Sequence, residues 1–124
     1  MKNQGFKELT VYKKSFELAM KIFEISKSFP KEETFSLTDQ IRRSSRSVST
    51  SIAEAYRKRI YPAHFVSKTS DADMENSETQ VWLDFAQECK YVSTEVKTDL
   101  EKQSAEIGRL LHHMINNPEK YTAN

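Results

Sequence analysis

The stretch LTDQIRRSSRSVSTSIAEAYRKR, residues 37–59, decides the fold. It contains neither glycine nor proline, and its apolar residues share one side of a helix: Leu37, Ile41, Val48, Ile52 and Ala55. At about 100° per residue these positions form one narrow stripe, which a disordered basic tail would lack. Ser44, Ser45 and Ser51 border the stripe, and their small side chains allow a neighbouring helix to approach closely. The stretch therefore predicts an amphipathic helix packed against partner helices.

Prolines and capping residues divide the rest of the chain around this helix. Pro30 ends a preceding helix, and Pro62 suits the first turn of a following one because its missing N–H would be unpaired there anyway. Ser36 and Ser93 are N-cap candidates for the second and fourth helices. We expect one domain over residues 1–124, with helices over about 7–28, 36–60, 62–91 and 94–116. Helices of this length joined by short loops predict an all-α, antiparallel up-down four-helix bundle.

The composition limits what such a bundle can be. The chain has 124 residues, and its 19 Lys and Arg against 18 Asp and Glu exclude a polycation, so any nucleic-acid site must depend on local charge. A single cysteine, Cys89, excludes an intrachain disulfide, and no signal peptide or membrane-spanning run of about 20 apolar residues is present. We therefore expect a cytoplasmic protein with no membrane association.

Two of the expected helices have apolar residues on opposite sides, although a single bundle buries one stripe per helix. In the first helix, Phe16 and Phe23 mark one side, which we place in the core, and the other side then needs a separate cover. We interpret the second sides as the interface of a homo-oligomer. A wider, skewed core within one chain is the alternative. The predicted interface residues are Val11, Leu18, Ile22, Ile25, Met74, Val81 and Phe85.

Arginines occupy the side of the second helix that faces away from its apolar stripe. The candidate nucleic-acid-binding residues are Arg42, Arg43, Arg46 and Arg57. The alternative is a solvated or salt-bridged surface, because Asp39 can pair with Arg43, and Glu54 with Lys58, at i,i+4 spacing.

Catalytic and metal-binding patterns are weak. Asp71, Glu75 and Glu78 share a helix face, but the Glu-x-x-His pattern of di-iron bundles is absent, and the adjacent His112 and His113 point about 100° apart. We expect no metal, no cofactor and no catalytic residue, and we expect the acidic face to pair with basic side chains such as the arginines of the second helix. Asn76 falls on the core stripe of the third helix, where a buried polar residue can fix the register of a bundle.

The run FPKEETFSLTDQIRRSSRSVSTSIAEAYRKR, residues 29–59, with FKELTVYKKSFELAMKIFEISKSFP before it, resembles a known family. FP, EE, LT, QIRR and IAEA occur in the order found in the four-helix-bundle proteins encoded by intervening sequences of bacterial 23S ribosomal RNA genes. That family also includes the accessory variability proteins of diversity-generating retroelements. The resemblance covers about residues 6–115. The chain differs from the family pattern at Ala55, where glycine is common, and in its acidic stretch SDADMENSETQ.

The resemblance implies a fold and an assembly but little chemistry. Members of the family form four-helix bundles that assemble as ring-shaped homopentamers without known catalysis. The retroelement members bind a reverse transcriptase and nucleic acid, and the arginines of the QIRR motif are Arg42 and Arg43 here. Two functions follow as expectations: a non-enzymatic oligomeric scaffold that binds protein partners, or a nucleic-acid-binding accessory protein that uses the arginines of the second helix.

Overall fold

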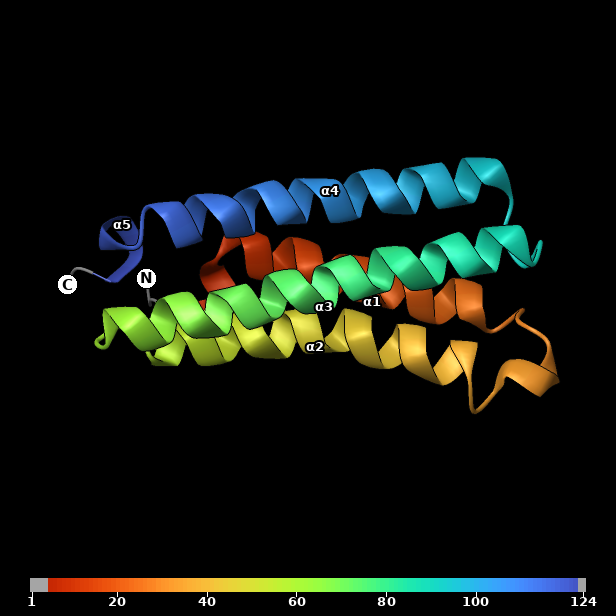
Figure 1. Ribbon diagram of the computed structural model, residues 1–124, viewed down its shortest axis with the longest axis horizontal. Coiled ribbons are helices and arrows are strands. Elements are labelled where there is room, and N and C mark those ends of the chain that lie inside the picture. Colours follow the sequence, from red (N-terminus) through yellow and green to blue (C-terminus); the bar gives the residue numbers. More distant parts are fainter. Residues whose placement is uncertain (1–4, 123–124) are drawn as a thin grey trace.

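A computed structural model describes residues 5–122, which form four long helices and three short ones (Figure 1). The long helices are α1 (Thr10–Ser26), α2 (Leu37–Arg57), α3 (Pro62–Glu88) and α4 (Thr94–Asn116). The short ones are the 3-10 helices η1 (Gly5–Glu8) and η2 (Lys31–Glu33) and the final turn α5 (Glu119–Thr122). The described part of the chain is all-helical, as predicted, and none of its helices is long and apolar enough to cross a bilayer.

The long helices form a four-helix bundle in which helices consecutive in sequence lie side by side. α2 packs against α1 and α3, and α4 closes the bundle by packing against α3 and α1. α1 and α3 therefore occupy diagonal corners, and α3 lies in front of α1 in Figure 1. The outer surfaces of these two helices point in opposite directions.

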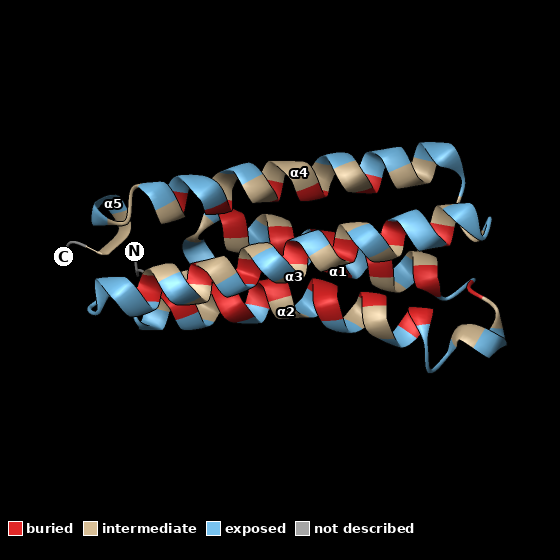
Figure 2. Ribbon diagram, viewed as in Figure 1, coloured by how far each residue is buried: buried red, intermediate tan, exposed pale blue. Residues whose placement is uncertain are grey.

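The core consists of one stripe from each helix (Figure 2). All five positions of the stripe in α2 are buried, as the spacing predicts. Phe65, Ala72 and Leu83 of α3 and Leu100, Ile107 and Leu111 of α4 complete the interior. Burial of this apolar surface supplies the main stabilisation of the bundle.

Small polar residues inside the bundle are hydrogen-bonded across helix pairs. The hydroxyl of Ser44 lies 2.8 Å from that of Thr79, linking α2 to α3, and Ser15 lies 2.8 Å from Ser49, linking α1 to α2. Asn76 donates to the carbonyl of Ser104 at 2.9 Å and accepts from its hydroxyl at 2.9 Å. Because a shifted register would leave these buried groups unpaired, the bonds favour a single alignment of α3 with α4.

The helix ends correspond only partly to the predicted caps. Ser93 accepts from the Val96 N–H at 3.1 Å and caps α4, but Ser36 makes no such bond. Instead, the Glu33 carboxylate accepts from the Leu37 N–H at 3.1 Å and from the Ser36 hydroxyl at 2.6 Å. α1 begins at Thr10 rather than about residue 7, because η1 and the extended backbone at Leu9 precede it.

The orientation of α1 is opposite to the predicted one. Val11, Leu18 and Ile22 are buried in the core of the chain, with Ile22 only 1% exposed, whereas Phe16 is 52% exposed. Ile25 is half-buried against the core. Val11, Leu18 and Ile22 therefore cannot form the outer face that we predicted, and Ile25 reaches the surface only beside α4. Both sides of the helix carry large apolar residues, so periodicity alone did not identify the inner one.

Candidate interaction surfaces

Three of the four predicted arginines lie around one hollow on the outside of α2. Arg42, Arg43 and Arg46 line this hollow, which has a volume of about 410 Å³ and also includes Asp39. Arg57 is exposed but lies eleven residues further along α2 than Arg46, about 16 Å away along the helix axis. The structure thus places Arg42, Arg43 and Arg46 together and leaves Arg57 apart.

Contacts with α1 and α3 hold these arginines in place. The Arg42 Nε donates to the Ser26 hydroxyl at 2.7 Å, and its guanidinium lies 4.8 Å from the centre of the Phe23 ring. Arg46 lies 5.6 Å from the same ring, and the Lys27 Nζ lies 4.9 Å from it, so Phe23 of α1 contacts three cations. Neither arginine lies within ion-pair distance of a carboxylate in residues 5–122.

Arg43 forms an ion pair across helices instead of along its own. Its Nη2 lies 3.1 Å from the Glu78 Oε2 of α3, and Glu54 pairs with Lys68 of α3 at 2.8 Å. The i,i+4 pairs predicted along α2 are thus replaced by pairs that connect α2 to α3. The general expectation that arginines of the second helix neutralise the acidic face of α3 is confirmed for Glu78.

The acidic face of α3 is only partly neutralised. Asp71 lies 3.4 Å from Lys68, but the Glu75 Oε1 is buried without a hydrogen-bond partner. Burial, followed by repulsion from Glu78, raises the pKa of the Glu75 carboxyl above its usual value. Within the described range, no group of three or more His, Cys, Asp or Glu side chains is arranged to bind a metal ion. The lone thiol, Cys89, is exposed at the C-terminal cap of α3.

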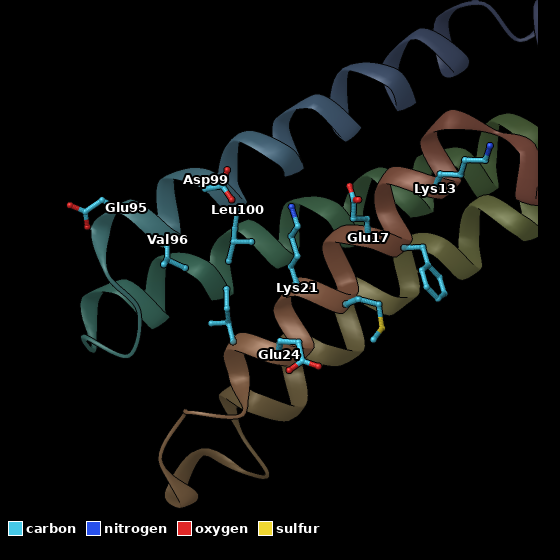
Figure 3. A pocket seen from close by; sticks show the side chains of 11 residues that line it. Lys13, Glu17, Lys21, Glu24, Glu95, Val96, Asp99 and Leu100 are labelled. Atoms are coloured by element: carbon cyan, nitrogen blue, oxygen red, sulfur yellow. The ribbon is translucent and has the colours of Figure 1, made fainter.

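Two grooves follow the sides of α1, and both are lined by Phe16 and Met20. The α1–α4 groove has a volume of about 800 Å³ and an apolar floor that includes Ile25, Val96 and Leu100 (Figure 3). Charged side chains line its rim: Lys13, Glu17, Lys21, Glu24, Glu95 and Asp99. The α1–α2 groove has a volume of about 400 Å³ and includes Phe6, Tyr12 and Arg46.

A second exposed apolar surface lies on α3. Met74, Val81 and Phe85 are 68%, 47% and 54% exposed, and we call these three residues the α3 ridge. They follow one line along the helix, opposite the buried side that holds Phe65, Thr69, Ala72 and Leu83. The inward side of α3 is as predicted, and the three predicted interface residues on this helix are at the surface.

Sequence reasoning missed the role of Phe16 and Met20, because it assigned their side of α1 to the interior. A signal was present in the serines of α1. Ser15 and Ser26 lie on the side with Ile22, and both are buried, as are four of the five serines of α2. Small hydroxyl residues on facing helices mark a close approach, and the same argument applied to α1 would have selected the correct side.

Comparisons with known proteins agree with the fold. The sequence profile of the 23S rRNA-intervening sequence protein family matches residues 7–113. A solved structure with a similar fold is a protein of unknown function from the S23 ribosomal protein family of Bacteroides thetaiotaomicron, 32% identical, with a TM-score of 0.78. The match covers 86% of this chain and 95% of that one. No curated protein matches the chain. Neither family description names a catalytic activity. Because the profile covers most of the bundle, the chain belongs to the 23S rRNA-intervening sequence protein family.

Proposed function

We propose that the protein is a non-enzymatic, self-associating scaffold whose copies bind one another through exposed apolar side chains of α1 and α3. The observation that supports this most directly is the exposure of Phe16, Met20, Met74, Val81 and Phe85. Large apolar side chains grouped on a helical surface favour association over solvation. Their position on two diagonal helices gives each copy two separate contact surfaces.

Light scattering coupled to gel filtration tests the assembly directly. We expect a stable homo-oligomer at micromolar concentration, and native mass spectrometry would count the subunits. The family resemblance implies a ring of five copies. A monomer at micromolar concentration would overturn the proposal.

Nucleic-acid binding is a second candidate, favoured by the convergence of Arg42, Arg43 and Arg46 on one hollow. Arg42 and Arg46 have no carboxylate partner within residues 5–122, so both can contact phosphate without losing an ion pair. The link to the accessory variability proteins of retroelements, and through them to a reverse transcriptase, belongs to this candidate. Arg43 contributes less, because Glu78 already neutralises it.

RNA and DNA binding at low and physiological salt tests this candidate. Phosphate binding should weaken linearly in log salt, with a slope of about 0.9 per neutralised phosphate on B-form DNA. Arg42→Glu/Arg46→Glu should abolish the binding, whereas Lys102→Glu/Arg109→Glu, an equal charge change at exposed positions of α4, should reduce it only modestly. Absence of binding at low salt would remove the nucleic-acid function.

A further inference from the structure

The contact surfaces of the scaffold differ in shape and charge, and this difference bears on how two copies meet. The α3 ridge is convex, because Met74, Val81 and Phe85 project directly away from the core. Trp82 packs against Phe85 with ring centres 6.0 Å apart and donates to Glu78 at 3.1 Å, which restricts the ridge at that end. A helix that presents apolar residues along one line is the shape that enters a groove between two other helices.

Both grooves beside α1 have an apolar lining that suits such a ridge, so apolar contact alone does not select one of them. Charge distinguishes them. Four carboxylates flank the ridge: Asp71, Glu78, Asp84 and Glu88. The first three form ion pairs within the chain, with Lys68, Arg43 and Lys97. Glu88 lies within ion-pair distance of no basic group in the described chain.

The α1–α4 groove would repel these acids, since four carboxylates and two lysines of the described residues line its rim. The α1–α2 groove has the opposite character. None of the described residues that line it carries a carboxylate, Arg46 lies at its edge, and Arg42 lies beside Arg46 against the Phe23 ring. An acidic ridge therefore complements the α1–α2 groove in charge as well as in apolar surface.

We propose that the α3 ridge of one copy docks in the α1–α2 groove of the next copy, head to tail. This assignment rests on the proposed self-association. The ridge lies on the outer side of α3 and the groove lies between α1 and α2, so a single contact leaves the groove of one copy and the ridge of the other free. Such a heterologous contact repeats around a ring when the rotation closes, and along a filament when it does not.

Two variants that each block one surface test the assignment. Phe16→Glu/Met20→Glu blocks the groove, and Met74→Glu/Val81→Glu blocks the ridge; all four positions are exposed, so both chains should fold. Each variant alone should be monomeric, because it lacks one half of the contact. Mixed at equal concentration, they should form a 1:1 heterodimer through the intact ridge of one and the intact groove of the other.

Thr98→Glu/Lys102→Gln is the matched control, with the same change in net charge on the outer side of α4, and it should assemble like the wild type. Circular dichroism checks the helical content of every chain. Variants with alanine in place of glutamate at the same four positions repeat the test with less risk of unfolding the chain. A wild-type monomer would contradict the self-association itself. A wild-type oligomer with either blocked variant still assembled, or with the mixture still monomeric, would overturn the head-to-tail contact and leave self-association standing.

Discussion

Ile22 and Phe16 lie on the same helix, but only Ile22 is enclosed by neighbouring helices. Ile22→Ala should lower the free energy of unfolding by about 2–5 kcal/mol, because it removes buried methyl groups and leaves a cavity. Phe16→Ala should cost less than about 1 kcal/mol in a folded monomer, since half of that side chain already contacts solvent. Urea unfolding followed by circular dichroism measures both values.

The control for this comparison is protein concentration. Any contribution of Phe16 to assembly depends on concentration, whereas the loss at Ile22 does not. Equal destabilisation by the two alanine variants in the dilute, monomeric limit would contradict the orientation of α1.

Glu75 is a second residue whose environment predicts a measurable change in stability, in this case one that depends on pH. Burial raises the pKa of its carboxyl above the ordinary 4.5, so the neutral acid is favoured more strongly in the folded chain than in the unfolded chain. The stabilisation from that neutral form is complete below pH 4.5 and is lost as the pH rises through the folded-state pKa. Glu75→Gln should therefore stabilise the protein at pH 7, by up to about 1 kcal/mol, and have little effect near pH 4.

Urea midpoints at pH 4 and pH 7 test this difference. Glu17→Gln, an exposed position on α1, is the matched control and should change neither midpoint by a comparable amount. A Glu75→Gln variant less stable than the wild type at pH 7 would show that the buried carboxylate has a partner.

At the scale of the elements, the end of α3 contains a strained residue. Lys90 has a φ of +65°, a left-handed conformation that glycine adopts more readily. The Tyr91 N–H bonds to the Ala86 carbonyl at 2.8 Å, and the Lys90 N–H to that of Gln87 at 2.9 Å, so the turn to α4 depends on this conformation. Lys90→Gly should raise the free energy of unfolding by about 0.5–1 kcal/mol.

Lys90→Ala separates backbone strain from loss of charge, because alanine removes the lysine but keeps the Cβ. It should leave the urea midpoint nearly unchanged. An equal gain from alanine and glycine would mean that the lysine charge, not the backbone conformation, destabilises the turn.

The long helices could be predicted from sequence because their limits depend on local chemistry: Pro62 begins α3 and Ser93 caps α4. The cap of α2 could not, since Glu33 reaches it from the preceding turn and is itself held by the Tyr91 hydroxyl at 2.8 Å, 58 residues away. Pairing between arginines of α2 and acids of α3 was predicted in general, but the individual Arg43–Glu78 pair could not be, because it depends on the alignment of two helices. Spacing along one helix shows which pairs can form, whereas the packed bundle decides which of them do form.

At the scale of the whole molecule, a net charge of +1 conceals an uneven distribution. Arg42 and Arg46 of α2 lie beside the α1–α2 groove, and Glu88, which has no ion-pair partner among residues 5–122, lies beside the ridge on α3. A molecule with unlike charges on two different surfaces favours head-to-tail association over two-fold pairing of like surfaces. The arginines then serve either the contact between copies or a nucleic acid, but not both at once.

That competition yields a prediction about RNA binding. If a neighbouring ridge covers Arg46, the monomeric Met74→Glu/Val81→Glu variant should bind single-stranded RNA more tightly per subunit than the wild-type assembly. We expect a difference of about tenfold, since a hydrogen bond to a charged group contributes about 1.5 kcal/mol. Fluorescence anisotropy at low salt measures it, with Thr98→Glu/Lys102→Gln as the assembled control of equal net charge. Tighter binding by the wild type would instead place the arginines on the outside of a multivalent array and contradict the docking of the ridge.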